Sequence, residues 1–261
     1  MNRNKLSRRE SLRMLLAGTA FLAGGSLISC GRKKKHIITL SFDDGFRKSS
    51  IETARLYEKY RLSACINIIA TADDPAFVLP NEYHAWPVGD FDLWNELKSR
   101  GHEIMPHTFR HADLAKLPFE EATDLMSKCF DVFLEKLEGF RTEDCIYNFA
   151  FNSSTPELEE WLSARVRAFR TGGGGRNPLP HTGQQKLTCT GGGPENIDAQ
   201  LERTINEFLD GPPGWLIYNT HGLDDEGWGP LSSSYLDELL DRMQSHETAE
   251  MLSVTQALDL A

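Results

Sequence analysis

The chain has 261 residues, of which 40% are hydrophobic and 25% are charged, as expected for one large or two small globular domains. Its formal net charge of −10 argues against a nucleic-acid-binding protein, which would present a basic face. We therefore expect no nucleic-acid partner and a domain large enough to bury a full hydrophobic core.

The first 29 residues differ in composition from the rest of the chain. Basic residues between Arg3 and Arg13 precede an apolar run from Met14 to Ile28. This run is too short to span a bilayer comfortably but has the length of a signal-peptide core. Residues 1–29 are therefore predicted to be a signal peptide, and the mature protein is expected to be exported.

Two short motifs refine the prediction for this leader. Residues 7–12 contain Arg8-Arg9 and resemble a twin-arginine export signal, although an ordinary basic segment is the alternative. Residues 27–30 (Leu-Ile-Ser-Cys) resemble the lipobox of bacterial lipoproteins, in which Cys30 becomes lipidated. We expect a periplasmic or cell-envelope protein whose only membrane contact is Cys30, followed by a tether over residues 30–35.

Strand and helix patterns alternate along the rest of the chain. Apolar runs predict seven strands, at residues 37–42, 64–70, 103–105, 146–151, 168–170, 215–220 and 251–254. Periodic apolar residues predict helices between them, at 50–60, 91–100, 119–133, 156–165, 196–209 and 232–244. Such alternation predicts a parallel sheet with helical crossovers over residues 36–261, and the number of units favours a barrel over an open sheet.

Glycine and cysteine residues add little to this picture. The glycine-rich stretches 172–175 and 191–193 lack the spacing of a phosphate-binding loop, so we interpret both as flexible loop. Four cysteines follow Cys30, at positions 65, 129, 145 and 189, without any Cys-x-x-Cys pair. Disulfide bonds are possible in an exported chain, and the sequence does not select a pairing.

Two adjacent acids, Asp43 and Asp44, directly follow the first predicted strand. Catalytic groups of α/β barrels gather at the C-terminal ends of the strands. Because adjacent side chains diverge, one carboxylate can bind a metal ion while the other remains free as a base. A solvated Asp-Gly turn is the alternative interpretation.

Histidines follow two other predicted strands. His107 and His111 have a four-residue spacing that, on a helical turn, puts both imidazoles on one side, where they can share a metal ion. With Asp44 they would form an Asp-His-His site with open positions. His221 follows the sixth strand and is placed to act as a general acid. The alternatives are a helix-surface pair and a packed core histidine.

These segments resemble the motifs of a known enzyme family. Residues 41–45 (Ser-Phe-Asp-Asp-Gly) and 107–111 (His-Thr-Phe-Arg-His) are similar to the first two motifs of the polysaccharide deacetylases, the NodB-homology domains of carbohydrate esterase family four. Residues 101–104 and Thr220-His221 also resemble that family. The resemblance implies a distorted (β/α)7 barrel with Asp43 as general base and His221 as general acid. It also implies Asp44, His107 and His111 as ligands of a divalent metal ion.

The chain departs from this family in its third motif, which normally contains arginine and proline. The corresponding residues 147–152 contain neither. In the family, the arginine orients the base and a nearby backbone N–H stabilises the oxyanion. We expect a backbone N–H near Phe151 to keep the second role. Arg170, at the end of the fifth predicted strand, is a candidate substitute for the first. The fourth motif is unrecognisable, and residues 170–172 occupy its place.

The resulting expectation is a metal-dependent hydrolase that removes N-acetyl groups from an amino-sugar polysaccharide or oligosaccharide. Zinc is the expected ion, with cobalt or nickel as alternatives, because an Asp-His-His set suits all three. Phe151 and Trp228 are expected to contact the acetylated glycan. Two alternatives stay open: an O-acetyl xylan esterase or cyclic amide hydrolase with the same site, and a glycan-binding domain with weakened catalysis.

Overall fold

Mostly parallel strands form one curved sheet at the centre of the computed structural model, which describes residues 36–77 and 86–261. The strand order is β3-β2-β1-β8-β7-β5-β4, with β9 paired to β1 and β6 paired antiparallel to β8. The strands are β1 (His36–Phe42), β2 (Cys65–Ile68), β3 (Glu103–Pro106), β4 (Ile146–Asn148), β5 (Ala168–Gly172), β6 (Arg176–Asn177), β7 (Lys186–Gly191), β8 (Gly214–Thr220) and β9 (Ala249–Met251).

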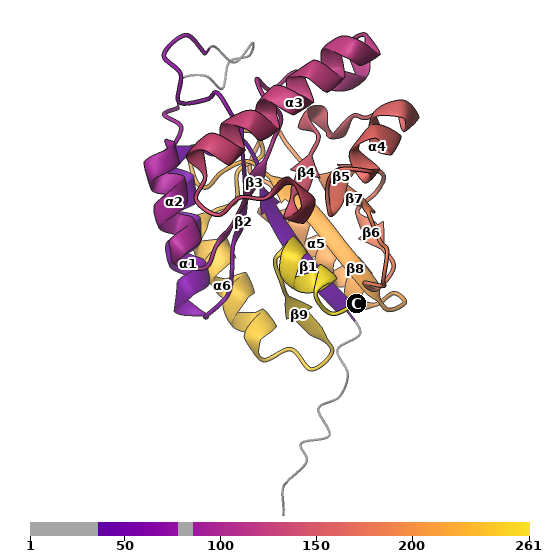
Figure 1. Cartoon of the computed structure of the whole chain (residues 1–261). Coiled ribbons are helices and arrows are strands. Elements are labelled where there is room, and N and C mark those ends of the chain that lie inside the picture. The colour runs from indigo at the N-terminus through magenta and orange to yellow at the C-terminus, as the bar shows by residue number, and fades with distance from the viewer. Residues whose placement is uncertain (1–35, 78–85) are drawn as a thin grey trace, which may run out of the picture. The chain divides into compact units, whose positions relative to one another are not determined.

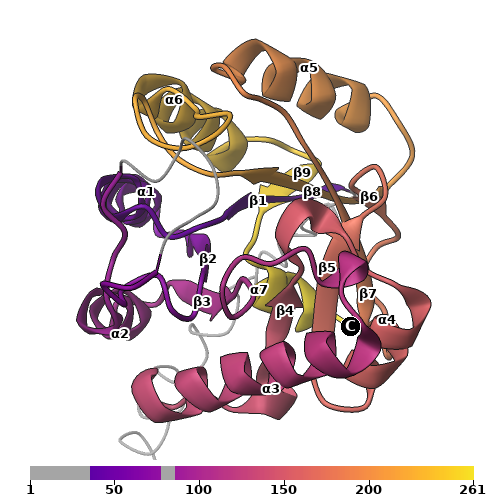
Figure 2. The same ribbon diagram turned by 90° about the horizontal axis from the view of Figure 1, so that it is seen from above.

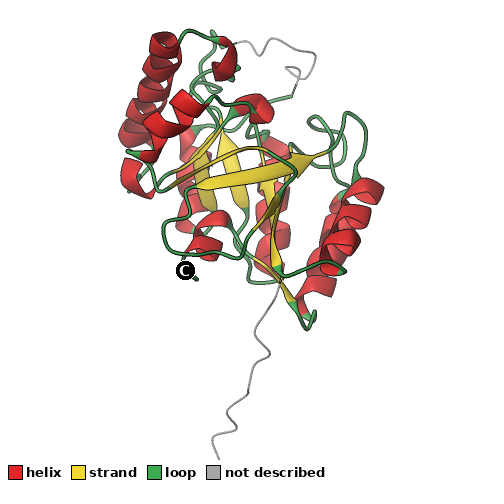
Figure 3. Cartoon of the chain, turned by 90° about the vertical axis from the view of Figure 1, so that its right-hand side faces the viewer, coloured by secondary structure: helices red, strands yellow, loops and turns green. Residues whose placement is uncertain are grey.

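Helices surround this sheet, as Figures 1 and 3 show. They are α1 (Arg47–Lys59), α2 (Phe91–Ser99), α3 (Phe119–Lys136), α4 (Pro156–Ser163), α5 (Asp198–Leu209), α6 (Ser233–Gln244) and α7 (Val254–Leu258). Each of the first six buries an apolar stripe against the outer face of the strands, while its polar residues face solvent. The predicted alternation of strands and helices is therefore confirmed.

The sheet is nearly closed as a barrel, with β3 and β4 as its two edges. Viewed from above, the strands curve around a common centre, and α3 crosses outside the edges (Figure 2). Side chains rather than a strand ladder link these edges. The Asn148 amide donates to the Pro106 carbonyl at 3.2 Å, and the Ile146 N–H donates to the Met105 sulfur at 3.5 Å. The predicted distorted barrel is confirmed.

A second core fills the interior of the barrel at the end where the strands begin. Residues from the starts of several strands, among them Ile37, Cys65 and Trp215, pack against Val254 and Leu258 of α7. The short helix thus closes this end of the barrel. Because the interior there is filled, functional side chains can gather only at the opposite end, where the strands finish.

The buried Glu103 holds α7 in this position. One of its carboxylate oxygens accepts the Thr255 N–H at 2.6 Å, in the first turn of α7. The other accepts the thiol of Cys65 at 3.0 Å. An acceptor at a helix N-terminus satisfies an amide that has no partner within the helix.

Two sequence expectations are corrected. β6 and β7 lie between the two glycine-rich stretches, where we predicted no strand, and β7 ends at Gly191 of the second stretch. The glycines obscured the alternating burial of the β7 side chains. The last predicted strand, Met251–Val254, is also wrong in extent, since β9 ends at Met251. A capping box between Ser253 and Gln256 starts α7 instead.

Parts of the predicted domain organisation lie outside the described residues. These are the signal peptide of residues 1–29, Cys30 and the tether of residues 30–35. Within residues 36–77 and 86–261, no helix has both the length and the apolar character needed to cross a bilayer. The four cysteines of the described chain are buried and free, so none of them forms a disulfide bond there.

Replacement of Glu103 by alanine should destabilise the protein by about 1–3 kcal/mol, because it leaves the Thr255 amide and the Cys65 thiol without their acceptor. Urea denaturation monitored by circular dichroism measures this loss. Glu135→Ala, at an exposed position on α3, is the control and should change stability by less than about 0.5 kcal/mol. Equal stability of the two variants would contradict the proposed closure of the barrel by Glu103.

Candidate active site

Polar side chains from several strand ends meet at the open end of the barrel. Asp43 and Asp44 follow β1, His107 and His111 follow β3, and His221 follows β8. Together with residues after β4 and β7, they line a cavity of about 450 Å³: Asp43, Asp44, His107, His111, Phe151, Asn152, Gly191, Asn219, His221 and Trp228. The structure therefore brings the predicted site residues together, except that Arg170 lies behind Asp43 and does not line the cavity.

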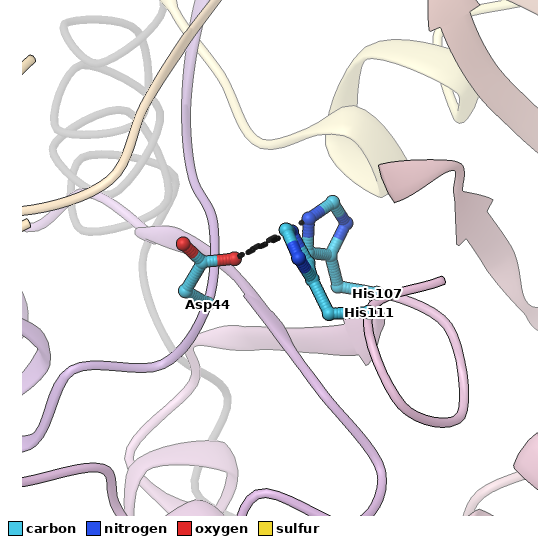
Figure 4. Close-up of side chains that lie close together, drawn as sticks. All are labelled: Asp44, His107 and His111. Atoms are coloured by element: carbon cyan, nitrogen blue, oxygen red, sulfur yellow. Dashed lines mark ion pairs between the residues drawn. The ribbon is translucent and has the colours of Figure 1, made fainter. Parts of the chain in front are cut away.

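Asp44, His107 and His111 form one cluster of potential metal ligands. Their ligand atoms all lie within 4.8 Å of one another, and all three residues are buried. Oδ1 of Asp44 is 3.5 Å from Nε2 of His107 and 3.3 Å from Nε2 of His111. Figure 4 shows the carboxylate and the two imidazoles directed toward a common point.

The histidines are not on a helical turn, contrary to the sequence prediction. Residues 107–111 form an irregular loop in which Thr108 (φ 67°) and His111 (φ 53°) adopt left-handed conformations. The Ala70 N–H donates to the Thr108 carbonyl at 3.0 Å and fixes the loop against the chain after β2. Two residues with left-handed backbone conformations therefore bring the imidazoles together. The four-residue spacing alone cannot indicate this geometry.

The chemistry of these three side chains fits a divalent cation. Oδ1 of Asp44 is buried and has no hydrogen-bond partner among the described residues, which is costly for a carboxylate oxygen unless a cation neutralises it. Nδ1 of His107 must donate to the Asn148 carbonyl, 3.2 Å away, so its Nε2 keeps a free lone pair. Burial lowers the pKa of His107 to about 4, against the opposing effect of the two carboxylates, so the imidazole is neutral at neutral pH.

Asp43 is held by donors of the protein itself. Oδ2 accepts from Nη2 of Arg170 at 2.6 Å and from the Asn219 amide at 3.1 Å. Oδ1 accepts from the Asn67 amide at 2.8 Å. Nη1 of Arg170 also donates to the Ser41 hydroxyl at 2.9 Å, so the guanidinium spans two residues of the same strand end. Both oxygens of Asp43 are thereby fixed in direction.

This contact is a fully buried ion pair. Burial alone would raise the pKa of Asp43, but the charge and the hydrogen bond of Arg170 hold it well below its usual range. Burial alone would likewise lower the pKa of Arg170, and the Asp43 carboxylate raises it instead. Among the described residues, Arg170 is the only buried arginine or lysine. The two adjacent buried acids, Asp43 and Asp44, thus have a single buried Arg or Lys between them, Arg170, and its contact is with Asp43.

His221 and Trp228 form one side of the cavity. Their ring centroids lie 5.3 Å apart at an interplanar angle of 89°. Nδ1 of His221 is buried, and no residue in the described part of the chain forms a hydrogen bond with it. Trp228 is 36% exposed, so part of this large apolar residue is accessible at the cavity that it lines.

Phe151 forms another side of the cavity. It lies in the 3-10 turn Ala150–Asn152 that follows β4, and its φ of 58° is left-handed, a strained conformation for a bulky residue. Phe151 is 55% exposed, and the centroid of its ring lies 4.7 Å from that of the His111 ring. Two exposed aromatic rings, Phe151 and Trp228, therefore frame the buried polar groups.

Sequence analysis missed the amides that contact Asp43. Asn67 and Asn219 sit in strands whose other residues are mostly apolar, and both are buried. An asparagine in a buried strand requires partners for its amide, and this requirement was the available signal. The identity of the partner could not be inferred, because it depends on which strands are neighbours.

Comparisons with known proteins identify the family of this chain. A family model described as polysaccharide deacetylase matches residues 31–191. No curated protein matches the chain. Solved structures with a similar fold include the peptidoglycan deacetylase PdaC from Bacillus subtilis, with a TM-score of 0.54 and 16% identity over 88% of this chain and 92% of that chain.

Two further structures have the same fold. A family 4 acetyl xylan esterase from Clostridium thermocellum, in complex with a cobalt ion, has a TM-score of 0.56 and 16% identity over 86% of this chain and 91% of that chain. A peptidoglycan N-acetylglucosamine deacetylase from Eubacterium rectale has a TM-score of 0.54 and 15% identity, with the same coverages of 86% and 91%. At this identity, the likeness concerns the fold. The family model, however, spans more than half of the chain, and the chain therefore belongs to the polysaccharide deacetylase family, carbohydrate esterase family four.

Proposed function

We propose that this protein is a divalent-metal-dependent hydrolase that removes N-acetyl groups from an amino-sugar polysaccharide or oligosaccharide. The observation that carries the proposal is the difference between its two adjacent acids. Asp43 is fixed by three donors, whereas Oδ1 of Asp44 faces two imidazoles and has no hydrogen-bond partner in the part of the chain that the structure describes. One acid is thus prepared to act as a base and the other to hold a cation.

Asp44, His107 and His111 would hold the cation, with zinc as the expected ion and cobalt or nickel as alternatives. A divalent cation there supplies a Lewis acid that polarises the acetyl carbonyl and makes a water molecule more acidic. The cavity has space beside the three ligands for substrate. A cobalt ion is present in the similar acetyl xylan esterase structure, which supports a divalent cation here.

Asp43 would accept the proton of the attacking water. A base must point at the proton it removes, and Arg170 supplies that orientation through its contact at 2.6 Å. Arg170 would thus replace the arginine that the family carries in its third motif, from the neighbouring strand β5 instead. This substitution weakens the case for a non-catalytic glycan-binding domain, because the missing arginine was the reason to consider it.

His221 would protonate the departing amine, which leaves poorly as an anion. A backbone N–H near Phe151 would donate to the oxyanion of the tetrahedral intermediate. The aromatic rings of Phe151 and Trp228 would contact the sugar. An O-acetyl ester such as acetylated xylan is the second candidate substrate, favoured by the likeness to the acetyl xylan esterase.

We also propose that the protein acts outside the cytoplasm. The predicted signal peptide of residues 1–29 and the lipobox cysteine, Cys30, support export with a lipid anchor. The similar structures include peptidoglycan deacetylases, whose substrate lies in the cell envelope. An acetylated cell-envelope glycan is therefore the substrate class to test first.

Purified protein should release acetate from N-acetylated glycans, lose this activity in chelator, and regain it with added zinc or cobalt. His107→Ala should lose both bound metal and activity, because it removes one of three ligands. Asp43→Asn should lose activity and keep its metal. Acetate release and metal content by mass spectrometry measure these effects. Chelator-resistant activity, or equal metal content in wild type and His107→Ala, would contradict the proposed metal site.

Substitution of Arg170 by alanine should lower kcat at least about 10²-fold without loss of metal, because Asp43 loses its orientation. The variant should also lose about 3–5 kcal/mol of stability, since Asp43 stays buried without its partner. Arg170→Lys should retain more activity than Arg170→Ala but less than wild type, because an ammonium cannot reach Ser41 and Asp43 as a planar fork does.

The matched control for this variant is Arg167→Ala. Arg167 forms an exposed ion pair with Asp259 just before β5, and exposed pairs contribute little. Its kcat should equal that of wild type. Unchanged turnover in Arg170→Ala at a temperature where the variant is folded would remove Arg170 from the mechanism.

His221→Ala should lose about 10²–10⁴-fold in kcat on an N-acetyl glycan but far less on 4-nitrophenyl acetate. The difference arises because the nitrophenolate leaves without protonation, whereas the amine does not. Steady-state rates on both substrates measure it, with His181→Ala as the surface control. Equal losses on both substrates would exclude His221 as the general acid.

A further inference from the structure

The chain from His221 to Gly229 carries both His221 and Trp228 and passes over the mouth of the cavity. Its close turns depend on glycine: a Cβ on Gly222 would lie 2.2 Å from the Glu226 carbonyl oxygen. Gly227 has a φ of +87°, and the Gly229 N–H donates to the Pro194 carbonyl at 2.8 Å. We call residues 222–229 the Trp228 loop.

One buried carboxylate fastens this loop to helix α1. Oε2 of Glu226 accepts both the backbone N–H and the hydroxyl of Ser49, each at 2.7 Å. The Ser49 hydroxyl in turn accepts the Leu223 N–H at 2.9 Å. Glu226 is only 4% exposed, so these bonds are shielded from water. Ser49 and Glu226, which are 177 positions apart in the sequence, thus join the loop to the start of α1.

The first turn of α1 depends on this contact for its cap. The N-cap residue is Phe46, which makes no side-chain cap hydrogen bond, and the first turn contains no acidic residue. Glu226 supplies both missing elements, an acceptor for a free amide and a negative group near the positive helix end. The helix and the loop therefore fix each other.

The opposite side of the loop rests on the chain just after β7, which ends at Gly191. The Trp228 indole lies against the backbone of Gly193, where an added Cβ would come within 2.7 Å of three indole atoms. The loop is thus held at Glu226 on one side and at Gly193 on the other. Trp228 is fixed between these supports with 36% of its surface exposed at the mouth.

We infer that Glu226 is a positioning residue for substrate: through Ser49 it holds Trp228 as a preformed aromatic wall against which a sugar ring of the glycan binds. This inference rests on the proposed glycan substrate and adds the residue that determines where its ring is held. A wall fixed before binding avoids the entropy of ordering a loop around the ligand. Loss of Glu226 should therefore weaken glycan binding by freeing Trp228, although Glu226 itself lines no part of the cavity around Asp43 and Asp44.

The test measures tetra-N-acetylchitotetraose binding by calorimetry in an Asp43→Asn background, where no turnover is needed. Trp228→Ala and Glu226→Ala should each raise Kd by about 5–10-fold, as expected for one aromatic contact. The double variant should be no weaker than Trp228→Ala alone, because Glu226 acts through that ring. Glu226→Gln, which keeps an acceptor oxygen for the Ser49 amide, should recover most of the affinity.

Asp225→Ala is the matched control, because Asp225 precedes Glu226 and forms only an exposed ion pair with Lys48. Its Kd should equal that of the background. If Glu226→Ala does not fold, Ser49→Ala removes the shared hydroxyl and should weaken binding in the same way. Additive losses in the double variant, an unchanged Kd in Glu226→Ala, or no binding in the background protein would overturn the inference.

A different experimental result would reject the proposed function. Absence of acetate release by the wild-type protein from any acetylated glycan would reject the deacetylase, whatever the binding data show. In an active enzyme, Glu226→Ala should raise KM for the glycan by a larger factor than it lowers kcat, because the released Trp228 contacts the sugar and not the reacting acetyl group. A purely structural role would raise KM and lower kcat by similar factors.

Discussion

The site depends on the coexistence of two adjacent buried carboxylates. Two neighbouring negative charges shielded from water are strongly unfavourable unless each has a positive partner. Asp43 has Arg170, at 2.6 Å and fully buried. Within residues 36–77 and 86–261, Asp44 has no such partner, and its Oδ1 faces two imidazoles instead. The remaining negative charge is the physical reason for expecting a cation at this position.

The local backbone separates the two acids. Asp44 and Gly45, which follow Asp43 at the end of β1, both have left-handed φ values, of 72° and 76°. Aspartate tolerates this conformation better than most residues, and glycine adopts it without strain. The turn directs the Asp43 side chain toward Arg170, Asn67 and Asn219, whereas Asp44 faces the histidine loop. The Asp-Asp-Gly sequence thus gives two acids of different chemistry from one strand end.

Much of the fold was predictable because hydrophobic periodicity is local. The runs that form β1, β2 and β8 are continuous and apolar, and the helices between them carry clear stripes. β7 was missed because the glycine-rich stretches on either side of it, 172–175 and 191–193, indicated a loop. Met251–Val254 was assigned as a strand because its capping signal at Ser253 was overlooked. Both errors come from reading one local signal while a competing one decided the structure.

The residues of the candidate site also divide into those that the local sequence predicts and those that it does not. Asp43, Asp44, His107, His111 and His221 were predictable because each directly follows a strand, and barrel geometry collects such residues. Asn67, Ser49 and Glu226 were not, because their roles depend on partners far away in sequence. Arg170 lay between these cases: its strand position was apparent, but its contact with Asp43 depends on how β5 curves toward β1 across the barrel.

The most direct measurement is anomalous diffraction at the zinc edge from crystals of the protein grown with zinc. The balance of buried charge predicts one strong peak about 2.0–2.2 Å from Oδ1 of Asp44 and from Nε2 of His107 and His111. It also predicts that Asp43 keeps its contact with Arg170 and does not bind the ion through both oxygens. A saturating zinc concentration with no peak at these three atoms would contradict the account.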